Sequence, residues 1–193
     1  MLRGMSINDV ARDGMDTPSA WPVVGLSLPA RDVVRAAVGD PQVVARYRAK
    51  IAYASPGECW PFTGAIHPHG HGRFFVGQYT DTHGTRRDVV VIAHRFGWAI
   101  THGADSLDQV AALAHDCDEA GCQNPAHLAP ATMASNHHDW DTRRWQLGSP
   151  LRDVRGAAGR ARAIRAAILT GQDVAAARAA GISSLDRDQL PLW

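Results

Sequence analysis

Residues 115–136, HDCDEAGCQNPAHLAPATMASN, decide the interpretation of this chain. Four residues separate Cys117 from Cys122, and four more separate Cys122 from His127. This spacing is typical of zinc ligands in a short loop. A zinc site needs four ligands, and Cys59, the remaining cysteine, can supply the fourth. We therefore expect these four residues to hold one structural zinc ion. The alternative is three buried free cysteines and a surface histidine.

Several motifs between about residues 46 and 144 give the chain a resemblance to a known family. They are ECWPFTG at 58–64, GHGRF at 70–74, AHR at 93–95, the cysteine segment and Asn136. Their order and spacing resemble the ββα-metal (His-Me finger) nucleases, and within them the zinc-bound phage or homing branch of HNH endonucleases and the His-Cys box homing endonucleases. The resemblance implies an α+β fold. In it, a strand, a metal loop, a second strand and a helix form a nuclease core stapled by zinc, with antiparallel strands and flanking helices.

The same resemblance implies the chemistry of a DNA endonuclease. His115 is the expected general base, with its second ring nitrogen held by a backbone carbonyl, and a neutral imidazole suits proton transfer near neutral pH. Asn136 is the expected ligand of a catalytic Mg²⁺ or Mn²⁺ ion. Ala114 stands where an aspartate often precedes the base. We therefore expect a site with one asparagine, to which His137 or His138 can add a ligand.

The implied reaction is hydrolysis of phosphodiester bonds in double-stranded DNA, leaving 5′-phosphate and 3′-hydroxyl ends. In it His115 activates a water, and the ion on Asn136 stabilises the departing 3′ oxygen. The alternative is a non-catalytic, zinc-stabilised adaptor that binds DNA or a sliding clamp. The joint presence of His115 and Asn136 favours the enzyme, because a decayed nuclease would usually have lost one of them. Taken singly, His115 can instead be a core or zinc-associated residue, and Asn136 an ordinary helix-surface residue.

Arginines on the predicted strands supply candidates for phosphate contacts. An arginine beside the scissile phosphate stabilises the negative charge of the transition state. We assign this role to Arg73, with Arg86 as the second choice. Arg86, Arg87, Arg143 and Arg144 are expected to contact DNA, the alternative for each strand position being an ordinary surface arginine.

Four other histidines surround these motifs. His67, His69 and His71 alternate in a loop rich in glycine and proline. A second metal ion is conceivable there, but a flexible loop facing DNA is the favoured interpretation. His94 is expected to be structural and to pack under the site.

Hydrophobic periodicity and capping signals predict the secondary structure. Asp40 and Pro41 are a typical helix start, and Thr132 is a plausible N-cap. Helices are expected at 29–38, from 41 to near 55, and at 94–101, 132–145, 160–169 and 173–180. Strands are expected at 73–79, 86–93, 110–114 and 127–131.

With 193 residues, of which 45% are hydrophobic, the chain has room for one ordinary domain and appendages. We expect a disordered N-terminus at 1–28, helices at 29–57, the zinc-stapled nuclease domain at 58–147, a basic helix-turn-helix-like appendage at 148–182 and a tail at 183–193. The net charge of +1 excludes a polycation. Residues 141–165 nevertheless contain seven arginines and two aspartates. They suggest either a phosphate-tracking face or a solvated linker and helix.

The three cysteines, an odd number, argue against a disulfide framework. No signal peptide or membrane span is recognisable, and we expect a cytoplasmic, nucleoid-associated protein with no membrane partner. A homodimer is left open. The final segment resembles the peptide that binds bacterial sliding clamps, with Gln189, Leu190, Leu192 and Trp193 as its contact residues. The alternative is that this tail docks on its own domain.

Overall fold

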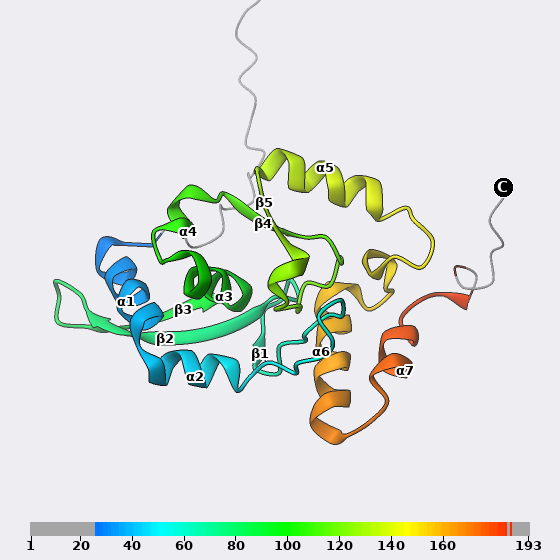
Figure 1. The fold of residues 1–193 in the computed structure, drawn as a ribbon, viewed down its shortest axis with the longest axis horizontal. Helices are drawn as coiled ribbons and strands as arrows, with labels where there is room; N and C mark the ends of the chain where they lie inside the picture. The colour runs from blue at the N-terminus through cyan, green and yellow to red at the C-terminus, as the bar shows by residue number, and fades with distance from the viewer. Residues whose placement is uncertain (1–25, 185, 187–193) are drawn as a thin grey trace, which may run out of the picture.

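Residues 26–184 and 186 are described by a computed structural model, and they form a mixed α+β fold with two small antiparallel sheets (Figure 1). The strands are β1 (Ala65–Ile66), β2 (Gly72–Thr80), β3 (Arg86–Ile92), β4 (Ala112–His115) and β5 (Leu128–Ala131). The α+β prediction is confirmed at this level. The predicted clamp-binding residues Gln189 to Trp193 lie outside the described residues, as does most of the predicted disordered N-terminus.

Helices flank both sheets. They are α1 (Leu28–Gly39), α2 (Pro41–Arg48), α3 (Ala93–His102), α4 (Ser106–Gln109), α5 (Met133–Arg143), α6 (Gly156–Thr170) and α7 (Val174–Ala179), with 3₁₀ turns at η1 (Pro125–His127) and η2 (Pro150–Arg152). The caps act as the sequence predicts. The Asp40 carboxylate accepts from the amide of Gln42 at 2.8 Å, and Thr132 and Ser135 form a reciprocal capping box. Strand β1 and helix α4 were not predicted.

Helix α2 ends at Arg48, well before the predicted end near residue 55. The backbone beyond it pairs with another segment instead of continuing the helix. The Ala52 amide donates to the Pro61 carbonyl at 3.0 Å, and the Thr63 amide donates to the Lys50 carbonyl at 2.8 Å. Residues 49–64 therefore form a loop closed on itself, and this loop carries Cys59 towards the second sheet.

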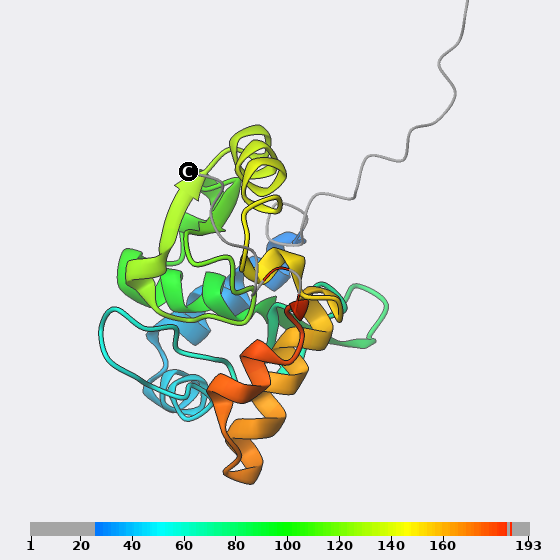
Figure 2. The same ribbon diagram turned by 90° about the vertical axis from the view of Figure 1, so that its right-hand side faces the viewer.

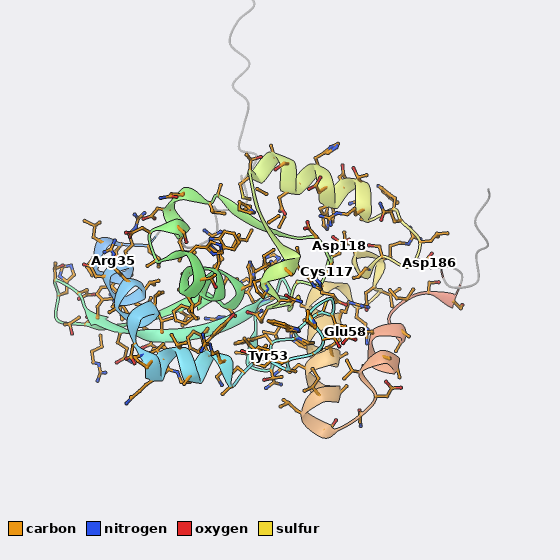
Figure 3. All side chains as sticks on the ribbon, viewed as in Figure 1. Arg35, Tyr53, Glu58, Cys117, Asp118 and Asp186 are labelled. Carbon is orange, nitrogen blue, oxygen red and sulfur yellow. The ribbon has the colours of Figure 1, made fainter. Side chains whose placement is uncertain are left out.

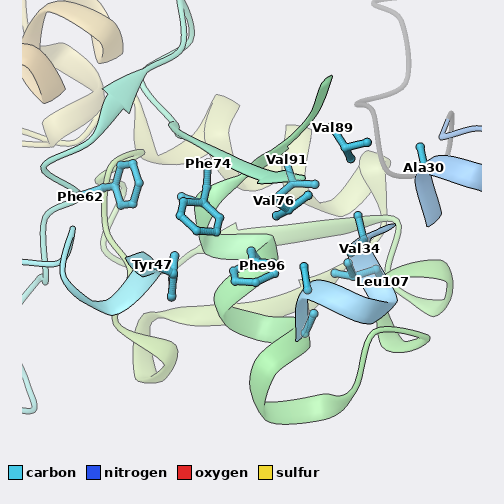
Figure 4. Packing of buried hydrophobic residues seen from close by; sticks show 13 residues of the cluster. Ala30, Val34, Tyr47, Phe62, Phe74, Val76, Val89, Val91, Phe96 and Leu107 are labelled. Atoms are coloured by element: carbon cyan, nitrogen blue, oxygen red, sulfur yellow. The ribbon is translucent and has the colours of Figure 1, made fainter. Parts of the chain in front are cut away.

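The main core lies between the β2–β3 hairpin and helices α1, α2 and α3 (Figure 4). Four aromatic side chains at its centre, Tyr47, Phe62, Phe74 and Phe96, are each at most 3% exposed. The Tyr47 ring meets the rings of Phe74 and Phe96 edge-on, with centroids 5.4 Å away in each case. Burial of one such side chain stabilises a fold by roughly 1.5–3 kcal/mol. The buried Tyr47 hydroxyl donates to Gln123 at 3.0 Å, which ties this core to the loop after β4.

The second sheet and α5 follow the order strand, loop, strand, helix. Strands β4 and β5 are antiparallel, with His115 opposite Leu128. The loop between them, residues 116–127, contains Cys117, Cys122 and His127. Helix α5 begins two residues after β5. Because Ala131 pairs with Ala112, α5 begins near the start of β4, and its last turn reaches the end of β4 through Arg143.

Helices α6 and α7 pack against each other and against the loop after β4 (Figure 2). Gly70 approaches the backbone of α6 so closely that a Cβ would lie 2.7 Å from the Ala157 carbonyl oxygen. The Arg160 guanidinium donates to both carboxylate oxygens of Glu119 through Nε at 3.0 Å, and its Nη1 lies 3.2 Å from buried Asp153. These helices therefore contact the predicted metal loop directly.

The arginines of residues 141–165 are mostly engaged inside the molecule. Five of them form ion pairs with described carboxylates, and Arg165 donates to the Thr63 carbonyl. The five are Arg143, Arg144, Arg152, Arg155 and Arg160. Much of the positive charge of this segment is therefore paired inside the molecule, while Arg162 is exposed. Of their partners, Asp118, Glu119 and Asp186 come from other parts of the sequence, and Asp141 and Asp153 lie within the segment.

Arg160→Met should lower the free energy of unfolding by about 3–5 kcal/mol, because it removes the close partner of the buried Glu119 carboxylate and leaves Arg178 at 3.9 Å as its remaining cation, while Asp153 keeps Arg155. The measurement is urea denaturation followed by circular dichroism. Arg162→Met is the matched control, since Arg162 is exposed on the same helix, and it should change stability by less than about 0.5 kcal/mol. Equal stability of the two variants would show that the buried pair is not a structural element.

Candidate metal centres

Cys59, Cys117, Cys122 and His127 come together in the structure as the sequence predicts. Their ligand atoms all lie within 4.8 Å of one another. The His127 Nδ1 atom is 3.7 Å from the Cys59 sulfur and 3.6 Å from the Cys122 sulfur. Zinc bonds of about 2.3 Å to sulfur and about 2.0–2.1 Å to nitrogen put such atoms about 3.6 Å apart in a tetrahedron. The cluster can therefore hold a metal ion such as zinc without rearrangement of these contacts.

Two loops from distant parts of the sequence supply the four ligands. Cys59 lies in the loop after α2, and the other three lie in the loop between β4 and β5. Figure 3 marks these loops by Glu58, which precedes Cys59, and by Cys117. Backbone bonds join them at Cys122, where Pro61 forms an isolated bridge. Neither loop has a hydrophobic core of its own. A metal ion bound by ligands from both loops would therefore stabilise their contact.

Asn124 is the residue that holds the two loops together, and the sequence analysis missed it. Its side chain is 1% exposed, and its amide nitrogen donates to the carbonyls of Pro56 at 2.8 Å and Glu58 at 2.7 Å. Its side-chain oxygen accepts from the Ala126 amide at 3.0 Å. In the sequence, the Asn-Pro pair at 124–125 indicates only a turn. No sequence pattern indicates the long-range hydrogen bonds of Asn124 to the other loop.

The thiols are crowded enough to perturb one another. Hydrogen bonds from Cys117 and then Cys59 hold the pKa of Cys122 well below its usual range. The hydrogen bond to Cys122 raises the pKa of Cys117. A divalent cation takes the place of such shared protons when thiolates bind it.

A pocket of about 120 Å³ lies beside β4 and next to the first turn of α5. Its polar lining includes His115 at the end of β4, His94 and Arg95 in the first turn of α3, His71 just before β2, and Asn136. The apolar lining comes from Ile92, Ala111, Ala112, Leu113 and Met133. The structure thus brings the two predicted catalytic residues, His115 and Asn136, to one cavity.

The His115 ring is fixed by the metal loop. Its Nε2 atom lies 3.1 Å from the Cys122 carbonyl oxygen, and the side chain is 9% exposed. A carbonyl only accepts, so Nε2 carries the proton and Nδ1 carries the lone pair. Burial lowers the pKa of His115, an effect that the bond to Cys122 partly offsets. The expected backbone partner for this ring is therefore present, and it belongs to a residue of the cysteine cluster.

The favoured interpretation of His71 as part of a flexible DNA-facing loop is wrong. Its Nδ1 atom lies 3.0 Å from the Ala120 carbonyl oxygen, and its ring stacks on His115 with centroids 5.8 Å away. His94 is 4% exposed and its ring lies 4.5 Å from that of His115. It was expected to pack under the site, and it forms part of the pocket wall. Burial lowers the pKa of His71 to about 4 and that of His94 well below its usual value.

Asn136 is half-buried and lines the pocket, whereas His137 and His138 are exposed and do not. Consecutive residues of an α-helix point about 100° apart, because one turn takes 3.6 residues. The proposal that His137 or His138 adds a ligand to this site is therefore wrong.

The predicted arginines occupy three different places. Arg73 is exposed on β2 opposite Ile92, and Ile92 lines the pocket. Arg86 and Arg87 lie at the other end of the hairpin, beside the 81–85 turn, and Arg87 pairs with Asp81 at 2.8 Å (Figure 1). Arg86 pairs with Thr80 at the opposite end of β2 from Arg73, and its role as the second choice for the scissile phosphate stays a prediction.

The Arg143 side chain is held by hydrogen bonds to backbone carbonyls and by an ion pair. It donates to the carbonyls of His115 at 3.3 Å and Asp116 at 3.1 Å, and it pairs with Asp118 at 3.1 Å. It thus ties the last turn of α5 to the end of β4. Arg144 stacks between Trp140 and Trp145, with its guanidinium carbon 4.6 Å and 4.5 Å from the two ring centroids.

No family model, curated protein or solved structure matches this chain. Among the described residues, no helix combines the length and apolar character needed to cross a membrane. The functional proposal below is therefore argued from the geometry of the two centres.

Proposed function

We propose that this chain is a metal-dependent DNA endonuclease of the ββα-metal type, with the Cys₃His cluster as its structural zinc site. One observation carries the proposal. His115, with its lone pair on Nδ1, and Asn136, with its side-chain oxygen, line the same pocket at the junction of β4 and α5. A positioned base and a hard-ion ligand are the two groups that hydrolysis of a phosphodiester requires.

In this proposal His115 acts as general base. Its Nδ1 atom accepts the proton of a water as the water attacks the phosphorus, and the Cys122 carbonyl keeps the ring from turning. The ring is buried and neutral before the reaction, which leaves the nitrogen able to accept. Such a positioned base contributes about 10²–10⁴-fold to a rate.

Asn136 is the residue that would hold a Mg²⁺ or Mn²⁺ ion. An amide oxygen is a suitable ligand for a hard cation that keeps most of its waters. When bound, the ion supplies Lewis-acid stabilisation of the phosphate and the leaving 3′ oxygen. Arg73 is the proposed phosphate contact, and the expected products carry 5′-phosphate and 3′-hydroxyl ends.

Asn136→Ala should slow cleavage by about 10²-fold or more, because metal stabilisation is worth several kcal/mol and each 1.4 kcal/mol is a factor of ten. The measurement is single-turnover cleavage of a labelled DNA duplex in Mg²⁺, with the ends of the products identified. His137→Ala is the matched control, since His137 is exposed on the next position of α5. It should cut at the wild-type rate.

The same assay separates the enzyme from the adaptor. A zinc-loaded protein that binds the duplex in a gel shift but leaves it intact in both Mg²⁺ and Mn²⁺ would overturn the proposal in favour of a DNA-binding module.

A further inference from the structure

We propose that His71, His94 and His115 form a second metal site, which binds a divalent transition ion of the Zn²⁺, Co²⁺ and Ni²⁺ class. The three ligand nitrogens lie within 4.8 Å of one another. The rings come from three separate elements: the entry to β2, the first turn of α3 and the end of β4. Their convergence is a feature of the tertiary structure, and it is separate from the Cys₃His cluster.

The geometry is close to that of a bound ion. Bonds of about 2.0–2.1 Å in a tetrahedron put nitrogen ligands about 3.3 Å apart, so the rings need to close by at most about 1.5 Å. Ring centroids are 4.5 Å apart for His94 and His115, and 5.1 Å apart for His71 and His94. The cavity of about 120 Å³ leaves room for the ion and for a further ligand, a water or Asn136.

His71 and His115 each make a hydrogen bond to a backbone carbonyl of the kind that orients metal-binding histidines. His71 donates from Nδ1 to the Ala120 carbonyl at 3.0 Å, and His115 donates from Nε2 to the Cys122 carbonyl at 3.1 Å. Each bond fixes a tautomer and places the lone pair on the opposite nitrogen. The third ring, His94, is 4% exposed, and its Nδ1 has no hydrogen-bond partner among the described residues. A buried polar atom of this kind costs free energy unless a partner is supplied.

The ligand set selects the kind of ion. Imidazole nitrogens suit zinc, cobalt, nickel and copper, whereas Mg²⁺ prefers oxygen. Among the described residues that line the pocket there is no carboxylate. His71 and His94 are neutral at neutral pH because burial disfavours their charged forms. The site therefore presents three neutral nitrogen ligands, and the hard ion of the proposed reaction would sit on Asn136.

Occupation of this site has one consequence for the chemistry, and that consequence rests on the proposed function. The lone pair on His115 Nδ1 cannot bind an ion and accept a proton at once. A transition ion held by the three rings would therefore stop Mg²⁺-dependent cleavage. The Cys₃His loop supplies both backbone carbonyls that orient His71 and His115, so the intact zinc-loaded protein is the form that has this site.

Cobalt absorption tests the site without reference to cleavage. Zinc-loaded full-length protein is titrated with Co²⁺. The expected result is one further equivalent bound with visible d–d bands and without thiolate-to-cobalt charge transfer, while zinc stays at one equivalent. His71→Ala and His94→Ala should each weaken Co²⁺ binding by at least about 10²-fold, because even outer-shell changes cost 10–100-fold. His83→Ala, in the turn of the β2–β3 hairpin, is the control and should bind as wild type.

Wild-type protein that retains no Co²⁺ beyond its zinc would overturn the site, as would thiolate charge-transfer bands or unchanged binding in both histidine variants. His71 is only partly buried, so its variant keeps the test valid if His94→Ala fails to fold. Protein that cuts DNA in Mg²⁺ but binds no Co²⁺ contradicts this site alone. Protein that binds Co²⁺ as expected but never cuts DNA contradicts the proposed function alone.

Discussion

Replacement of Cys117 by serine should abolish zinc binding and unfold the loops that the Cys₃His cluster joins. A neutral hydroxyl is a poor substitute for a thiolate ligand, and structural zinc contributes about 10–16 kcal/mol of apparent binding free energy in small zinc-folded units. Whole domains are stable by only about 5–15 kcal/mol. The other supports of the loop after α2 are Phe62 in the main core, the Asn124 side chain and the backbone bridges at Pro61 and Ile51.

The measurement combines elemental analysis of the purified protein with thermal unfolding followed by circular dichroism. After dialysis against a weak chelator, which empties the proposed three-histidine site, wild type should contain one equivalent of zinc, and Cys117→Ser should contain none and melt at much lower temperature. Asp116→Ser is the matched control, because Asp116 is the exposed neighbour of Cys117 in the same loop. A zinc-free wild-type protein that folds cooperatively and keeps its function would contradict the structural role of the cluster.

The second large effect is expected when the proposed general base, His115, is replaced. His115→Ala should lower the single-turnover rate of DNA cleavage by about 10²–10⁴-fold, the contribution of a general base. The zinc content should stay at one equivalent, since the ring touches the cluster only through the Cys122 carbonyl. Loss of that hydrogen bond costs about 1 kcal/mol of stability, too little to unfold the protein.

The comparison uses wild type, His115→Ala and His83→Ala, all zinc-loaded, with the same duplex and Mg²⁺ concentration. His83→Ala removes a histidine from the exposed hairpin turn and should cut normally. If His115→Ala cleaves at the wild-type rate while folded, another group is the base and the assignment of this pocket fails.

The metal ligands were predictable because their signal is local. Three of the four lie within an eleven-residue segment, 117–127, and Cys59 was the only cysteine left to complete the set. The strand before and the strand after this segment follow from short apolar runs, and Thr132 marks the helix start by its capping side chain. Each of these features depends on residues close together in the sequence, so the pattern alone determines it.

The role of His71 was missed because it depends on distant contacts. In the sequence it stands in a loop with two other histidines and several glycines, a pattern typical of an exposed segment. In the structure its ring bonds to Ala120, 49 positions away, and packs against His94 and His115. Composition carries no information about such a contact.

The contacts of the C-terminal helices also could not be predicted from the sequence. Arg160 was predicted from its neighbours to be solvated or to track phosphate, but it is buried against Glu119 and Asp153. Charge counted along the sequence does not distinguish an exposed arginine from one paired with a carboxylate that comes from elsewhere. The helices themselves were predictable, and the surface on which they pack was not.

Incubation of zinc-loaded wild-type protein with supercoiled plasmid, with Mg²⁺ present or omitted, tests the central claim most directly. The account predicts conversion of the plasmid to nicked or linear DNA only when Mg²⁺ is present, with 5′-phosphate and 3′-hydroxyl ends at the breaks. Plasmid that stays supercoiled in Mg²⁺ and in Mn²⁺, in the presence of folded protein with one equivalent of zinc, would contradict it.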